Sequence, residues 1–343
     1  MRQTRLLAVV VCALAGGLAH AAPTEVQITP PQGARFLQGQ RFDLRVEGKG
    51  AGPYSATLTL DGRPVFFTSG AQGTTTTDGI SQAGYGGFNA RGFSLHRPGV
   101  HVLEATFTDA TGSTTVRSSF EIVDAGERED GRRWDGGGRG RGVKNVIFFL
   151  GDGMGASHRT AARIVGKGVT GGKPNGWLAM DRMPGVGLVT THSLNSIVTD
   201  SAPGMSCYTT GNHANNNQEG VFPARVTSPF HAPRVEYLGA YLHRMRGTST
   251  GIVSTADVED ATPAANAVYT ANRGAGTGIV DQYLDESSGN GLAVLLGGGR
   301  RWFLPATDPS RRARPRRTTR RSRPTSSRHG ISRRRAPRTR TGA

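Results

Sequence analysis

Hydrophobic and polar residues alternate in short stretches through residues 22–124, with turn residues such as Asp61 and Gly62 between them. The stretches that show this pattern are 42–46, 58–60, 103–107 and 116–122, and the apolar residues 65–67 follow the turn. Alternation is typical of strands that bury one face, and strands at this spacing are typical of two packed sheets. We therefore expect an immunoglobulin-like β-sandwich over residues 22–124, in architecture only, because that range holds no cysteine pair. Either a packing role or an accessory binding role would suit such a domain.

A second pattern begins at Lys144, where hydrophobic residues form runs without alternation. The runs are 146–150, 186–190, 251–254 and 292–296, and helix-compatible stretches separate them. Apolar strands spaced by helices are typical of a sheet covered on both faces, so the pattern predicts an α/β fold. Residues 125–143, between the two patterns, are dense in glycine and charge and lack periodicity, which predicts a flexible Gly/Arg linker.

The N-terminus has the pattern of a signal peptide. A basic start precedes the uncharged run 6–19, and the small residues Ala19 and Ala21 then flank His20. This pattern predicts removal of residues 1–21 and a secreted or periplasmic protein. The alternative is a membrane anchor, but the run is short against the ~20 residues of a spanning helix. Cleavage would leave Cys207 as the single cysteine, so we expect no internal disulfide.

The formal charge of +17 comes mostly from the C-terminus. Residues 311–343 hold 14 arginines and no acid, whereas the remaining chain carries 28 basic and 25 acidic side chains. We therefore expect residues 306–343 to be a disordered Arg-rich tail with no core. Three origins stay open: a shifted reading frame, a polybasic arm for anionic polymers, or a solvated extension. The tail lacks interleaved aromatic residues, so nothing in it indicates specific nucleic-acid binding.

Two segments that follow apolar runs carry oxygen ligands. Asp152 stands between glycines after the run 146–150, and Asp260 and Thr262 lie in the loop after the run 251–254. Ligands of open α/β folds gather beyond the carboxyl ends of the strands, and hard oxygens at that edge suit Mg²⁺. Taken singly, an Asp between glycines is as easily a turn residue.

A third segment has the pattern of a helix start. Asp200 and Ser201 precede Pro203, and Gly211 closes the stretch that follows. An ordinary capped helix accounts for this pattern. The same position also surrounds a serine with free N–H groups, which favour an alkoxide or a phosphoryl group. Arg273, further along, is either a solvated surface residue or a planar clamp for phosphate.

Together these segments resemble the bacterial alkaline phosphatases over residues 144–305. The matching segments are NVIFFLGDGMG, VTDSAPGMS, TTG, GIVSTADVEDATPAA with Arg273 after it, and LAVLLGGGRRWFLP. The resemblance implies the N-terminal part of a three-layer α/β core that hydrolyses phosphate monoesters with two Zn²⁺ and one Mg²⁺. It also implies a homodimer, as members of the family often form.

The resemblance also implies a role for each residue. Ser201 would be the nucleophile that becomes a phosphoserine at the zinc site, and Asp152 would bridge the second zinc and the magnesium. Asp260 and Thr262 would be magnesium ligands, and Arg273 would clamp the phosphate oxygens. Asp200 would help to orient that arginine.

The family pattern stops near Pro305. Members complete their zinc sites with later Asp and His residues and a Glu, but after Thr262 this sequence has a single histidine, His329. We therefore expect an incomplete catalytic core with phosphatase turnover greatly reduced or absent.

Two alternatives stay open. A sulfatase is disfavoured by Met205 in place of an arginine, and a non-catalytic exported protein would bind anionic polymers through the β-sandwich and the tail.

Overall fold

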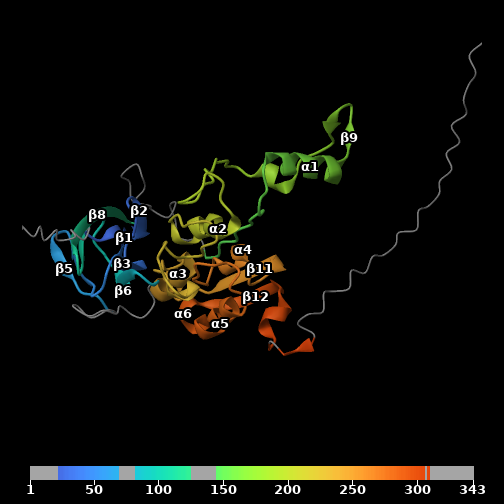
Figure 1. Ribbon diagram of the computed structural model, residues 1–343. Coiled ribbons are helices and arrows are strands. Elements are labelled where there is room, and N and C mark those ends of the chain that lie inside the picture. Colours follow the sequence, from blue (N-terminus) through green and yellow to red (C-terminus); the bar gives the residue numbers. More distant parts are fainter. Residues whose placement is uncertain (1–21, 69–81, 125–143, 306, 310–343) are drawn as a thin grey trace, which may run out of the picture.

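The computed structural model describes residues 22–68, 82–124, 144–305 and 307–309. The predicted signal peptide, the predicted linker and nearly all of the predicted tail lie outside these ranges, and the domain boundaries stay predictions. Figure 1 shows two regions side by side. Residues 22–68 and 82–124 form the N-terminal sheets, and residues 144–305 form what we call the helical region.

Eight strands make up the N-terminal sheets. They are β1 (Thr24–Thr29), β2 (Ala34–Leu37), β3 (Arg41–Lys49), β4 (Ser55–Leu60), β5 (Arg63–Val65), β6 (Tyr85–Ser94), β7 (Gly99–Asp109) and β8 (Gly112–Val123). One sheet has the order β1-β3-β6 and the other β2-β8-β7-β4-β5. Neighbouring strands are antiparallel except β2 and β8. The predicted turn joins β4 and β5, where Asp61 and Gly62 both have positive φ.

Both sheets contribute to one hydrophobic cluster. Leu44 and Val46 come from the first sheet and Leu103 and Phe107 from the second, and all four are completely buried. The alternation predicted along β7 and β8 is confirmed, because their inward residues are buried and the others are more exposed. Burial of the alternate apolar side chains is therefore the main stabilising contribution in this part of the chain.

Strand β3 departs from the expected one-sided burial, because its polar residues are buried as well. Asp43, Arg45 and Glu47 are each at most 3% exposed. Residues of the helical region cover this face: Asp43 exchanges two hydrogen bonds of 2.9 Å with the backbone of Arg234, and the Arg225 N–H donates to the Glu47 carboxylate at 3.0 Å. Because these contacts join residues far apart in the sequence, the alternation of hydrophobic and polar residues along the strand does not predict them.

The helical region confirms the α/β class. Its elements are α1 (Ala156–Lys167), β9 (Val169–Thr170), β10 (Lys173–Pro174), η1 (Ala179–Arg182), α2 (Ser201–Thr210), η2 (Pro229–His231), α3 (Leu238–Arg246), β11 (Thr250–Asp257), α4 (Ala261–Ala264), α5 (Thr277–Asp285), α6 (Ser287–Asn290), β12 (Leu292–Gly298) and η3 (Arg300–Phe303). Strands β11 and β12 are parallel, as their apolar runs predict. Ile252 of β11 packs with Ala264 of α4 and with Ile279 and Tyr283 of α5 in a second cluster.

The other two apolar runs do not form the predicted strands. Residues 146–150 and 186–190 are in no strand, and their large side chains are exposed, Leu188 completely so. A run that is apolar throughout becomes a strand only with a pairing partner and cover on both faces. Among the described residues, β11 pairs with β12 alone, so neither run has such a place. Figure 1 shows α1, which follows the first run, standing away from the rest.

Helix α2 is hydrogen-bonded to the N-terminal sheets at its C-terminal end. The Asn212 side chain accepts from the Arg35 N–H at 2.9 Å and donates to the Arg35 carbonyl at 2.7 Å. Gln40 donates to the Thr210 carbonyl at 3.2 Å. The sheets therefore fix one end of the helix whose other end carries Ser201. No helix within the described ranges is long and apolar enough to cross a membrane.

Candidate active site

Ser201 is the first residue of α2, as the capping pattern predicts. The Asp200 carboxylate caps the helix by accepting from the Ala202 N–H at 2.8 Å, and Pro203 lies in the first turn. Gly211 ends the helix with a φ of +78°. The half-buried Ser201 hydroxyl therefore lies at the positive end of the helix dipole, where a negative charge on its oxygen or on a bound phosphoryl group is stabilised.

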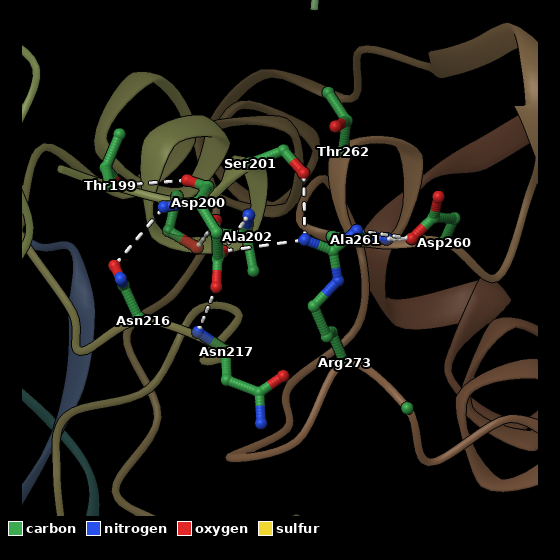
Figure 2. Close-up of polar contacts among 12 residues, drawn as sticks. Thr199, Asp200, Ser201, Ala202, Asn216, Asn217, Asp260, Ala261, Thr262 and Arg273 are labelled. Atoms are coloured by element: carbon green, nitrogen blue, oxygen red, sulfur yellow. Dashed lines mark hydrogen bonds and ion pairs between the residues drawn. The ribbon is translucent and has the colours of Figure 1, made fainter. Parts of the chain in front are cut away.

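Arg273 lies across the start of this helix, 72 residues away in sequence, with its guanidinium aimed at Ser201 (Figure 2). Nη1 donates to Ser201 Oγ at 3.0 Å and lies 3.6 Å from Asp200 Oδ1. Nη2 donates to Asp260 Oδ1 at 2.6 Å. The guanidinium is thus held between two carboxylates while one of its N–H groups reaches the serine oxygen.

Asp260 caps α4 just beyond the end of β11. Its Oδ1 accepts from the Ala261 N–H at 2.8 Å as well as from Arg273. Burial raises the pKa of the Asp260 carboxyl, but the hydrogen bonds from Arg273 and Ala261 outweigh burial and hold that pKa below its usual value. Asp260 is therefore a carboxylate at neutral pH, and it fixes the far side of the arginine.

Asp152 and Thr262 meet in the same part of the structure. The Thr262 hydroxyl donates to Asp152 Oδ2 at 2.7 Å, which joins the two segments that follow the apolar runs 146–150 and 251–254. The structure thus brings the six candidate residues into two sets of contacts. In the first set, Arg273 contacts Ser201, Asp200 and Asp260. In the second set, Asp152 contacts Thr262, which follows Asp260 by two residues in the sequence.

An amide-rich turn beside the site was missed by the sequence analysis. The Asn216 side chain accepts from the Asp200 N–H at 3.2 Å, and the Asn217 N–H donates to Asp200 Oδ2 at 2.7 Å. The Asn217 carbonyl accepts from the Arg273 N–H at 2.9 Å. A run of Asn residues after a helix is a recognisable turn signal, but nothing in it points to Arg273.

Two buried acids also lie near the site without having been predicted. Both carboxyl oxygens of the fully buried Glu219 lack a hydrogen-bond partner among the described residues, and so does one oxygen of Glu259. Burial raises the pKa of Glu219 well above its usual value, although the charge of Arg273 opposes this. Burial, with a contribution from Asp257, raises the pKa of Glu259 to about 7. Buried acids give no signal in a single sequence.

The donor atoms present decide which metal ions the site suits. Asp152, Thr262 and Asp260 offer carboxylate and hydroxyl oxygens, which fit Mg²⁺. Zinc prefers nitrogen and sulfur ligands as well as carboxylates. Within the described ranges, no group of three or more His, Cys, Asp or Glu side chains could hold a metal ion. The three oxygen donors are therefore of the kind that Mg²⁺ prefers, but the described residues form no complete site for magnesium or for two zinc ions.

A family model and the curated relatives that match this chain point to one family. A family model described as alkaline phosphatase matches residues 143–324, more than half of the chain. An alkaline phosphatase of Gadus morhua is 35% identical over 180 residues, covering 48% of this chain and 37% of that protein. The tissue-nonspecific isozyme of Homo sapiens is 35% identical over 186 residues, covering 48% of this chain and 34% of that protein.

Among solved structures, a cold-active alkaline phosphatase from Shewanella sp. is 28% identical with a TM-score of 0.37. That match covers 46% of this chain and 36% of the other. The chain spans about a third of the length of the curated relatives it matches.

Proposed function

The chain belongs to the alkaline phosphatase family, and from this premise we propose that it hydrolyses phosphate monoesters through a phosphoserine on Ser201. One observation carries the proposal: Arg273 Nη1 donates to Ser201 Oγ at 3.0 Å. A guanidinium beside a serine at a helix N-terminus is placed to bind the oxygens of a phosphoryl group that the serine attacks. Asp200 and Asp260 orient the guanidinium for this role.

The reaction has two steps. In the first, a bond forms between Ser201 Oγ and phosphorus while the ester bond to the alcohol breaks, and the serine proton leaves with the alcohol in the net balance. In the second, water breaks the bond between Oγ and phosphorus, which releases inorganic phosphate and restores the hydroxyl. In both steps, Arg273 and the N–H groups at the start of α2 face the negative charge of the phosphoryl group.

Asp152, Asp260 and Thr262 would hold Mg²⁺ by their oxygens. When bound there, the ion would supply positive charge that stabilises a negatively charged phosphoryl group. Since the described residues do not fit two zinc ions, no step is assigned to zinc. We infer that turnover by this chain with Mg²⁺ and Zn²⁺ supplied is far below that of longer family members.

The proposal extends to the rest of the chain. The cluster shared by the N-terminal sheets supports an immunoglobulin-like β-sandwich module before the catalytic core. The pattern of residues 1–21 supports export to the periplasm or the medium. By family analogy, we also propose a homodimer.

The experiment is to trap the covalent intermediate. The full chain is mixed with an aryl phosphate in the presence of Mg²⁺ and Zn²⁺ and quenched in acid, and the phosphorylated residue is located by mass spectrometry. We expect phosphate on Ser201. We expect Ser201→Ala to lose it and to lower residual turnover by at least about 10³-fold, whereas Ser288→Ala, at an exposed serine of α6, leaves both unchanged. Phosphate on another residue, or unchanged turnover in Ser201→Ala, would contradict the proposal.

A further inference from the structure

Residues 215–218, which we call the amide loop, form a tight turn between α2 and the buried Glu219. The Gln218 N–H donates to the Asn215 carbonyl at 3.1 Å, and the Gln218 side chain accepts from the Asn215 N–H at 3.0 Å. Asn217 is the third residue of this turn and has a φ of +78°. Turns with a positive φ at that position favour Gly or Asn, because other side chains are strained there.

The backbone of Asn217 contacts both charged residues that flank Ser201. Its N–H donates to Asp200 Oδ2 at 2.7 Å, and its carbonyl accepts from the Arg273 N–H at 2.9 Å. Figure 2 shows Asn217 below Asp200, on the same side of the site as the Arg273 backbone. One residue therefore fixes where the carboxylate of Asp200 points and where the Arg273 side chain begins.

The side chain of Asn217 contributes less than its backbone. It is exposed, and its one hydrogen bond to a described residue, from Nδ2 to Asn272 Oδ1, is long at 3.4 Å. Asn272 Oδ1 also accepts from the Gly274 N–H at 2.9 Å without help from Asn217. What the site needs from position 217 is therefore a left-handed backbone.

The hydrogen bond to Asp200 Oδ2 decides what remains available on Arg273. With Oδ2 bound to the amide loop and Oδ1 bound to the Ala202 N–H, Asp200 approaches Arg273 Nη1 only to 3.6 Å. That distance is too long for a hydrogen bond, so Nη1 is left to Ser201 Oγ. A carboxylate released from the loop could rotate into a bidentate pair with the guanidinium, which would compete with a phosphate anion for the same N–H groups.

We propose that Asn217 is a positioning residue, whose left-handed backbone keeps Asp200 from pairing fully with Arg273 and so leaves the guanidinium open to phosphate. The inference deepens the proposed function, because it assigns to one loop residue the phosphate affinity of that same site. Asn217 touches neither the nucleophile nor the reacting phosphoryl group and acts through its two neighbours.

Two variants at one position separate backbone from side chain. Asn217→Gly keeps the positive φ and removes the side chain, whereas Asn217→Val keeps a side chain that strongly disfavours that φ. Gly62→Val is the matched control, since it places the same strain at a φ of +76° in the β4–β5 turn, with nothing within 4 Å of the added Cβ. Two readouts on the full chain are used: calorimetric binding of inorganic phosphate with Mg²⁺ present, and hydrogen exchange of the Arg273 amide.

We expect Asn217→Val to bind phosphate about tenfold more weakly and to lose protection of the Arg273 amide, while Asn217→Gly and Gly62→Val behave as the parent chain. Unchanged exchange and affinity in Asn217→Val would overturn the inference, and so would an equal loss in Asn217→Gly, which would assign the effect to the side chain. If neither the parent chain nor any variant binds phosphate, the proposed function fails. Hydrogen exchange of the Arg273 amide in the variants then still tests whether Asn217 positions Arg273.

Discussion

The N-terminal sheets and residues 144–199 contain the same kinds of large apolar residue but differ in what covers them. Phe88 and Leu103 in the sheets are completely buried, whereas Phe149 and Leu188 are almost completely exposed. In the whole stretch 144–199, Ser193 is the single buried residue. Alternating strands need cover on one face, which two neighbouring sheets supply to each other. Runs that are apolar on both faces need cover from two sides.

The two regions also differ in how they treat buried charge. In the sheets, the buried Arg45 donates to Glu47 Oε2 at 2.7 Å and to the side chain of Asn89 at 3.1 Å, so both charges are compensated. Beside the candidate site, Glu219 is as deeply buried, but its carboxyl oxygens have no hydrogen-bond partner within the described ranges. The buried charges of the sheets are therefore paired, as in a structural core. The buried Glu219 carboxyl near Ser201 has no hydrogen-bond partner, which is more typical of functional sites.

The largest contrast is expected from truncating a phenylalanine in each region. Phe42→Ala removes a ring that stacks on Phe36 with centroids 3.7 Å apart, and should lower the free energy of unfolding by about 3–5 kcal/mol. Phe149→Ala, in the exposed run, should change it by less than about 0.5 kcal/mol. Urea denaturation of both variants measures the difference, and equal losses would show that the run 146–150 is buried in solution.

A pH-dependent effect of intermediate size is expected from Glu219. Its folded-state pKa is raised by burial, so above the usual pKa of glutamate the unfolded state gives up a proton that the folded state keeps. Stability should then fall as pH rises, by about 1.4 kcal/mol per pH unit, until the raised pKa is reached. Glu219→Gln has no such proton, so its unfolding free energy relative to the parent chain should increase with pH.

The measurement is urea denaturation of both proteins at a series of pH values between about 5 and 7. Asp285→Asn, at an exposed aspartate at the end of α5, is the control and should follow the parent chain at every pH. Parallel curves for Glu219→Gln and the parent chain would show that the Glu219 carboxyl has a charged or hydrogen-bonding partner in solution.

The smallest effect is expected where the two regions meet. Asn212→Ala removes both hydrogen bonds to the backbone of Arg35 and leaves the Arg35 N–H and carbonyl without them, which should cost about 1–3 kcal/mol of unfolding free energy. Asn175→Ala, at an exposed asparagine after β10, should stay within about 0.5 kcal/mol of the parent chain. Thermal and urea denaturation distinguish the two, and an unaffected Asn212→Ala would mean that the regions hardly stabilise each other.

Local signals predicted the elements that depend on local chemistry. Helix α2 was predictable because Asp200, Pro203 and Gly211 mark its ends within one short segment. The β4–β5 hairpin followed from Asp61 and Gly62. Strand β6 gave no signal, because its glycines interrupt the alternation. The fate of the runs 146–150 and 186–190 could not be predicted either, since it depends on partners elsewhere in the chain.

The site was predictable only as far as its motifs resemble a known family. That resemblance singled out Arg273 and Ser201 together, and the structure places them in contact. The contributions of Asn217 and Glu219 depend on a backbone conformation and on burial. Residue type and spacing predict neither the backbone conformation of Asn217 nor the burial of Glu219, so a single sequence does not reveal these two contributions.

The hydrogen bonds between the N-terminal sheets and the helical region have a consequence for the integrity of the chain. The N-terminal sheets form hydrogen bonds to groups more than 160 residues away through Gln40, Asp43 and Arg35. The two regions are therefore joined by non-covalent contacts as well as by the peptide bonds of residues 125–143. A protease that nicks the chain between residues 124 and 144 should therefore yield two fragments that co-elute on a sizing column. Two separately expressed polypeptides could reassociate in the same way, as a split protein does.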